Sequence, residues 1–176
     1  MLCVIALCCV VPLTGCQSTD APKTAPKSAG IEATDDGNIV ARVIPGRPCR
    51  ATVGGVELLV GGRPLVAQVG TDRWTGEDAE NGTTLRKNDQ IVARIHANQL
   101  FDANGIPLLR VLDNGDIVDK ANAVARKAIV AGDRVTIDSF TVTGTTDIAI
   151  AAMLTARETV PEVRALAVCH YLLEKP

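Results

Sequence analysis

After residue 16, the side chains best suited to metal binding or covalent catalysis are two cysteines and two histidines: Cys49, His96, Cys169 and His170. A structural Zn²⁺ site requires four ligands, at least two of them closely spaced in the sequence. Cys169 and His170 are adjacent, but neighbouring side chains on a helix point about 100° apart. The sequence therefore predicts no metal site and no cofactor, with metal ligation by this pair as the alternative.

The same residues give little support for catalysis. A cysteine nucleophile needs a histidine partner and an open pocket, whereas His170 lies in an apolar stretch where a thiolate is poorly solvated. His96 ends a predicted strand, a position more typical of a structural histidine than of a base. The sequence also has no nucleophile elbow, P-loop or dinucleotide-binding glycine pattern. We therefore expect no catalytic residues, and a protein that is not an enzyme.

Residues 70–89 form a long polar stretch that holds the only tryptophan, Trp74, with the acidic residues Asp72, Glu77 and Asp78. Their spacing does not match a calcium-binding loop. We predict a surface loop that contacts another protein, since long loops are often functional and an exposed aromatic ring is a typical anchor. In the alternative, Trp74 folds back over the sheet.

Composition excludes two classes of ligand. The formal net charge is -2 and no basic block stands out, which argues against nucleic acid as a partner. The chain has one Trp, one Tyr and two Phe, too few for a stacking platform that binds glycans or single-stranded nucleic acid. The core must therefore be built from Val, Ile, Leu and Ala.

The elements that position these residues are mainly strands. Gly-Gly and Asn-Gly pairs separate short runs of β-branched and aliphatic residues, and such pairs occupy hairpin turns that need positive φ. They predict strands at 39–44, 49–53, 56–60, 64–69, 90–95, 122–130 and 134–142. The fold class is mainly β: a meander of short antiparallel hairpins forming a sandwich, a barrel-like sheet or a repeat sheet.

Two helices are expected at the C-terminus. Thr146 and Asp147 precede a run of good helix formers, as a helix cap does. Thr159 and Glu162 then have the spacing of a capping box, with Pro161 in the first turn. Since the following helix, over 163–175, is apolar on nearly every face, it must be buried or lie in an interface. We expect both helices to pack on the sheet.

The N-terminus has the features of a targeting signal. Residues 2–12 are apolar but too few to span a bilayer. The run Leu13-Thr14-Gly15-Cys16 that follows resembles the lipobox of bacterial lipoproteins, although no Lys or Arg precedes the apolar run. The resemblance implies a signal peptide over 1–15, which would include three further cysteines, and lipidation of Cys16 by diacylglycerol and an acyl chain such as palmitate. Several acyl chains together anchor a protein stably.

The resemblance also implies a location. No Asp follows Cys16, so it favours the outer membrane, with the protein facing the periplasm or the cell surface. Residues 16–37 are predicted to be the lipidated cysteine and a flexible tether, since they lack an apolar period, and residues 38–176 a single domain. In an oxidising envelope, Cys49 and Cys169 are expected to form a disulfide, with free buried thiols as the alternative.

Part of the domain repeats weakly. Residues 100–111 align with residues 117–127 when one gap is allowed. Such units resemble the hairpin repeats of small bacterial β-repeat domains, in which neighbouring units bury one another. Two adjacent hairpins with similar turns would give the same pattern.

These observations favour an envelope lipoprotein with a structural or protein-interaction role. Its partners would be the membrane, through Cys16, and another envelope protein. One alternative is a periplasmic lipoprotein that binds a small molecule or a metal. Another is an unrecognised hydrolase, which would require polar residues to converge on one of the histidines.

Overall fold

The computed structural model describes residues 30–174. The signal peptide, Cys16 and most of the predicted tether lie outside the described residues. The described chain forms 14 strands and two helices. The strands are β1 (Ile31–Asp35), β2 (Asn38–Ile44), β3 (Cys49–Val53), β4 (Val56–Val60), β5 (Leu65–Val69), β6 (Asp72–Ala79), β7 (Gly82–Lys87), β8 (Gln90–His96), β9 (Gln99–Asp102), β10 (Pro107–Val111), β11 (Asp116–Val118), β12 (Val124–Ala131), β13 (Arg134–Ile137) and β14 (Phe140–Thr143); the helices are α1 (Ile148–Leu154) and α2 (Pro161–Glu174).

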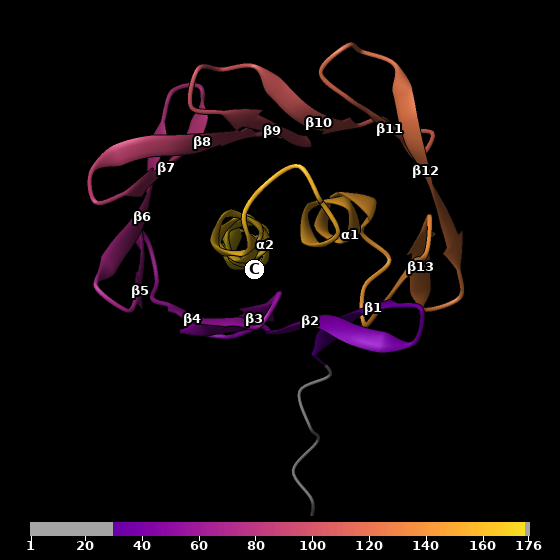
Figure 1. Cartoon of the computed structure of the whole chain (residues 1–176), viewed down its shortest axis with the longest axis horizontal. Coiled ribbons are helices and arrows are strands. Elements are labelled where there is room, and N and C mark those ends of the chain that lie inside the picture. Colours follow the sequence, from indigo (N-terminus) through magenta and orange to yellow (C-terminus); the bar gives the residue numbers. More distant parts are fainter. Residues whose placement is uncertain (1–29, 175–176) are drawn as a thin grey trace, which may run out of the picture.

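The strands form one antiparallel meander that curls into a near-closed barrel (Figure 1). Strand β1 pairs with β14, which brings the two ends of the meander together. Strands β4 and β5 meet only through the hydrogen bond from Gly61 N to Val66 O, at 3.0 Å. The predicted mainly β meander is therefore confirmed, and of the three arrangements left open it adopts the barrel-like one.

Both helices lie inside the ring of strands (Figure 1). In α1, every residue from Ala149 to Leu154 is buried, and in α2 so is every residue from Ala165 to Tyr171. Small wall residues such as Ala51 and Ala93, which are at most 1% exposed, let the helices approach the sheet closely. The packing of two C-terminal helices on the sheet is confirmed, with the sheet surrounding them.

Turn chemistry agrees with the sequence at most hairpins. Gly54 and Gly55 both have positive φ, at 54° and 82°, and Gly105 and Gly115 do as well. The Gly61-Gly62 pair does not, so the predicted tight turn there was wrong. A wider connection leads through Pro64 to β5 instead. At the start of α1, the Asp147 side chain accepts hydrogen bonds from the N–H groups of Ala149 and Ile150, as its capping position predicted.

Three boundaries were wrong. Residues 70–89 are no loop: they form the paired strands β6 and β7, in which Trp74, Thr75, Gly76, Thr83 and Leu85 are buried. The folded part begins before residue 38, because β1 over Ile31–Asp35 pairs with both β2 and β14. The single strand predicted at 134–142 is a hairpin of β13 and β14.

Because neighbouring strands run in opposite directions, the turns that connect them lie alternately at the two ends of the barrel. The Gly30 end, where the described chain begins, carries the connections at 45–48, 61–64, 80–81 and 97–98. Helix α2 ends there, since the Tyr171 hydroxyl donates to the Ala97 carbonyl. The opposite end carries the turn at Gly54, which lies against Pro161 at the start of α2. We call it the groove end, for the groove described below.

Cys49 on β3 and Cys169 on α2 form a disulfide, with an S–S distance of 2.06 Å. Both residues are fully buried. The bond closes a loop with a sequence separation of 120 residues and fixes the inner helix to the wall.

Replacing Cys49 and Cys169 together with alanine should lower the free energy of unfolding by about 4 kcal/mol, because the crosslink restricts the unfolded chain. Urea titration of the variant and of the oxidised wild type would measure the difference. Wild type held with a reducing agent is the control and should match the variant. Identical midpoints for all three proteins would show that the bond adds no stability.

Candidate functional site

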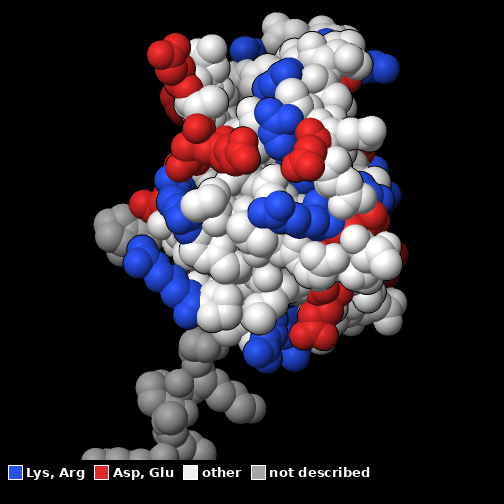
Figure 2. All heavy atoms as spheres, turned by 90° about the vertical axis from the view of Figure 1, so that its left-hand side faces the viewer, with Lys and Arg blue, Asp and Glu red and all other residues white. Residues whose placement is uncertain are grey.

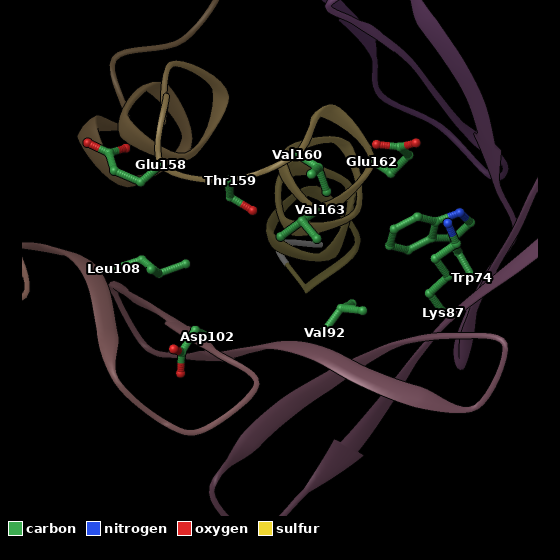
Figure 3. Close-up of a pocket in the computed structure, with 10 residues that line it drawn as sticks. All are labelled: Trp74, Lys87, Val92, Asp102, Leu108, Glu158, Thr159, Val160, Glu162 and Val163. Atoms are coloured by element: carbon green, nitrogen blue, oxygen red, sulfur yellow. The ribbon is translucent and has the colours of Figure 1, made fainter.

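A groove of about 390 Å³ opens at the groove end of the barrel, between the inner helices and the wall (Figure 3). Its apolar surface comes from the start of α2 and from strands β6, β8 and β10 of the wall. The contributing side chains are Trp74, Val92, Leu108, Val160 and Val163. Val160 is 50% exposed, whereas Val163 is buried below it. The groove therefore has an apolar floor open to solvent.

Trp74 forms one wall of this groove. Its indole ring faces the side of α2 that carries Val163 (Figure 3), and only 3% of the residue is exposed. The indole N–H is buried and has no hydrogen-bond partner among the described residues. Because that N–H is inaccessible, Trp74 offers the groove an apolar ring and no donor. Of the two positions considered for Trp74, the one folded back on the protein is correct.

Carboxylates dominate the rim of the groove. Glu158, Glu162 and Asp102 line it against a single cation, Lys87. Glu158 also lies 3.4 Å from Arg126, and Asp102 accepts hydrogen bonds from N–H groups of the turn that follows it. Glu162 has no ion pair within the part of the chain that the structure describes. The rim is therefore net acidic, and Glu162 interacts with the charges of Lys87 and Arg164 without a direct ion pair.

Lys87 contacts both Asp72 and Trp74. Its ammonium lies 2.7 Å from Asp72 and 5.6 Å from the centre of the Trp74 ring, a separation typical of a cation–π contact. The hydrogen bond with Asp72 raises the pKa of Lys87 and lowers the pKa of Asp72. Both groups are thus charged near neutral pH, and the negative charge of Glu162 on the rim also raises the pKa of Lys87.

A second polar cluster lies at the Gly30 end, around His170, beside a cavity of about 300 Å³. Glu174 lies 3.3 Å from Nε2 of His170, and the Thr83 hydroxyl lies 3.4 Å from each ring nitrogen. Arg63 forms ion pairs with Asp78 at 3.0 Å and with Glu174 at 2.8 Å. The cluster therefore ties the end of α2 to the connection before β5 and to β6 and β7.

Polar residues do converge on His170, which is what a hydrolase requires, but their arrangement is poor for catalysis. The Thr83 hydroxyl donates to Asp78 at 2.8 Å, so its hydrogen bond is not directed at the histidine. Thr83 is also only 3% exposed, which leaves little room for a substrate at its oxygen. Burial lowers the pKa of His170, while the negative charge of Glu174 opposes this shift.

The residues predicted to form one contact loop are divided between the two ends and the outer wall. Asp72 and Trp74 are at the groove end, Asp78 joins the His170 cluster, and Glu77 is exposed beside Arg86 at 3.6 Å. His96 ends β8, as predicted, and is exposed. No sequence motif marks Glu158, Val160 and Lys87 as binding residues. The capping box at 159–162 was the one signal near them.

No protein-family model, curated protein or solved structure matches the chain. Among residues 30–174, no helix is both long and apolar enough to cross a membrane. The same residues contain no group of three or more His, Cys, Asp or Glu side chains arranged to hold a metal ion.

Replacing His170 with glutamine should make stability less dependent on pH in the acidic range. The ordinary pKa of histidine is 6.5; since the folded-state pKa of His170 is lower, the unfolded chain binds the proton more tightly. Wild type should therefore lose stability as the pH falls below 6.5, towards the folded-state value. Urea unfolding at a series of pH values, for wild type and variant, measures this.

The matched control is His96→Gln, which removes the exposed imidazole and should leave the acidic loss of stability intact. If His170→Gln shows the same decline as wild type, the buried histidine does not cause it. The other charged groups facing His170, namely Glu174, Arg63 and Asp78, are unchanged in both variants.

Proposed function

We propose that the protein is a lipid-anchored binding protein of the cell envelope. It holds a segment of a partner polypeptide in the groove beside Trp74. Cys16 carries the lipid and residues 17–29 connect it to the barrel. The role is one of interaction rather than catalysis.

The observation that carries this proposal is the groove itself: an apolar floor with an acidic rim, on a barrel whose interior is filled. Because α1 and α2 occupy the lumen, the interior is filled by buried side chains where many ligand-binding barrels hold their ligand. Binding must use the ends or the outer wall. The groove is the recess there that combines exposed aliphatic side chains with carboxylates from different elements.

The chemistry of the groove indicates its occupant. Val92, Leu108 and Val160 suit an aliphatic or aromatic side chain, and such anchors dominate the energetics of most interfaces. The carboxylates of Glu158 and Glu162 suit lysine or arginine residues beside that side chain. The partner segment is therefore an apolar residue flanked by basic residues.

The position of the anchor fits this use of the groove. The described chain begins at Gly30, at the end of the barrel opposite the groove. A lipid on Cys16 would hold the Gly30 end towards the membrane. The groove end would then face away from it, towards other envelope proteins.

A small apolar molecule is the second candidate, and the size of the groove favours it. Its volume of about 390 Å³ lies within the range of small-molecule pockets, which runs from about 300 to 1,000 Å³. A cationic amphiphile would use the same apolar floor and acidic rim. The crosslinking experiment below separates the candidates, because only a polypeptide gives a protein adduct.

Changing Cys16 to serine should release the protein from the membrane, because no acyl chain can then be attached. Fractionation of cells expressing wild type or Cys16→Ser, with metabolic labelling by a palmitate analogue, measures location and lipidation together. Cys8→Ser is the control and should remain lipidated. Acylation of the Cys16→Ser variant, or wild type absent from the membrane fraction, would refute the proposed anchor.

A photo-crosslinking amino acid at Val160 should capture a partner protein in intact cells, whereas the same group at Val124 should not. Val160 lines the groove, whereas Val124 at the start of β12 does not, and the two residues are 50% and 59% exposed. Glu162→Lys should reduce the adduct at position 160 about tenfold, corresponding to ~1.4 kcal/mol. Mass spectrometry identifies the adduct.

Glu57→Lys, an equal change of charge on the exposed outer face of β4, is the control and should leave the adduct unchanged. Equal adducts at positions 160 and 124 would contradict the role of the groove. An adduct insensitive to Glu162→Lys would contradict the basic character of the partner.

A further inference from the structure

We infer that the outer wall beside Gly30 rests on an anionic lipid surface, through a patch formed by Ile44, Arg47, Arg50, Leu59 and Val66. We call these five residues the basal patch. The inference rests on the proposed lipid anchor, and it adds a second, direct contact between the folded barrel and the membrane.

Strand register brings the basal patch together. On neighbouring strands, Ile44 pairs with Arg50 and Arg50 pairs with Leu59. Since directly paired residues point to the same face of a sheet, these three side chains form a row. The row lies on the outside, because the alternate residues of β3 and β4, such as Cys49 and Leu58, are buried in the barrel.

Val66 extends the row across the place where β4 and β5 meet. The bridge between Gly61 and Val66 sets it beside the end of β4, and Arg47 lies in the connection between β2 and β3. Figure 2 faces the adjoining wall of β5 to β7, so the strands that carry the patch lie towards its lower edge. Uncharged surface occupies much of the lower part of this view, with Lys, Arg and an acidic group beside it, while most Asp and Glu lie higher up.

The apolar members of the patch are unusually exposed. Leu59 is 52% exposed and Val66 is 39% exposed. Aliphatic side chains beside arginines are typical of a surface that meets lipid headgroups, where the apolar groups reach the acyl boundary and the guanidinium groups remain among the phosphates. The combination fits a bilayer surface.

The two arginines of the patch are free to bind anions. Neither Arg47 nor Arg50 has an ion pair with any residue that the structure describes. By contrast, Arg42 pairs with Glu32 at 2.6 Å, and Arg63 pairs with Glu174 at 2.8 Å. Free guanidinium groups in the patch complement the phosphates of an anionic leaflet.

The start of the described chain lies directly beside the patch. A Cβ atom on Gly30 would be 3.1 Å from the Val43 carbonyl and 3.7 Å from a side-chain carbon of Ile44. Only residues 17–29 separate Gly30 from Cys16, and the length of the chain between them limits how far Gly30 can lie from a lipid on Cys16. A lipid on Cys16 therefore holds this part of the wall close to the headgroups.

The rest of the Gly30 end is less suited to an anionic surface. Glu80 in the β6–β7 turn and Asp113 in the β10–β11 turn are exposed there. They lie on other parts of the ring from β2 to β5. The membrane contact is thus confined to the side that carries the basal patch, and the barrel tilts towards that side.

The test measures which part of the barrel touches lipid. Leu59→Cys and Val124→Cys, each in the full chain and purified in lipidated form, are labelled with a thiol-reactive fluorophore. Each is reconstituted into phosphatidylcholine vesicles with and without phosphatidylglycerol. A spin label on the lipid headgroups quenches nearby fluorophores. We expect quenching of the Leu59 label in phosphatidylglycerol vesicles and none of the Val124 label.

Replacing the arginines tests the electrostatic contribution to the contact between the basal patch and the lipid. Changing Arg47 and Arg50 to glutamine should weaken the lipid contact about fivefold for each arginine, corresponding to ~1 kcal/mol. Arg73→Gln, which removes one positive charge at the groove end, is the control for either single variant and should leave the quenching unchanged. High salt should reduce the wild-type quenching as the arginine variants do.

The outcomes distinguish the inference from the proposed function. If wild type is not lipidated and does not stay with the vesicles, the proposed anchor fails. If it stays with the vesicles but the labels at positions 59 and 124 are quenched equally, only the basal patch is refuted. Quenching that is the same without phosphatidylglycerol refutes the anionic specificity. Should Leu59→Cys not fold, Val66→Cys replaces it in the same comparison.

Discussion

The filling of the barrel by its own C-terminal helices is the constraint on which the rest of the structure depends. In an eight-stranded barrel the side chains of the wall can fill the interior, but a ring of 14 strands leaves a lumen too wide for them. Here α1 and α2 supply the missing volume, with all of α1 after its first residue and the middle of α2 buried. The scarcity of aromatic residues follows, because two helices replace the large side chains that a wide core would otherwise need.

Helix α2 connects the two ends of the molecule. Its first turn carries Glu162 and Val163 into the groove, and its last turn carries His170 and Glu174 into the polar cluster. Between them, Cys169 fixes the helix to β3. A helix that fills a lumen must have its ends at the two openings, so both recesses are consequences of the filling.

The sequence predicted local structure well and closure poorly. Turn pairs such as Gly54-Gly55 determine hairpins through the φ values of two residues, and the cap at Asp147 determines a helix start through one side chain. Those are local causes. Residues 70–89 look like a loop because most of them are polar, and one of the buried positions is a glycine, Gly76, which packs against Leu65. The pairing of β1 with β14 joins residues more than 100 positions apart, and no local pattern encodes it.

The groove could not be predicted either, because it also depends on contacts between distant parts of the chain. Trp74 was a candidate because it is the only tryptophan of the chain. Its neighbours in the groove, such as Leu108 and Val160, come from distant parts of the chain and meet only when the barrel closes around α2. The cysteine pair was predictable because a covalent bond requires just two residues, and few were available. A recess built from ordinary valines, leucines and glutamates has no comparable signature. Closure places the groove opposite Gly30, so the direction in which the protein presents its binding surface is set by the fold rather than by any motif.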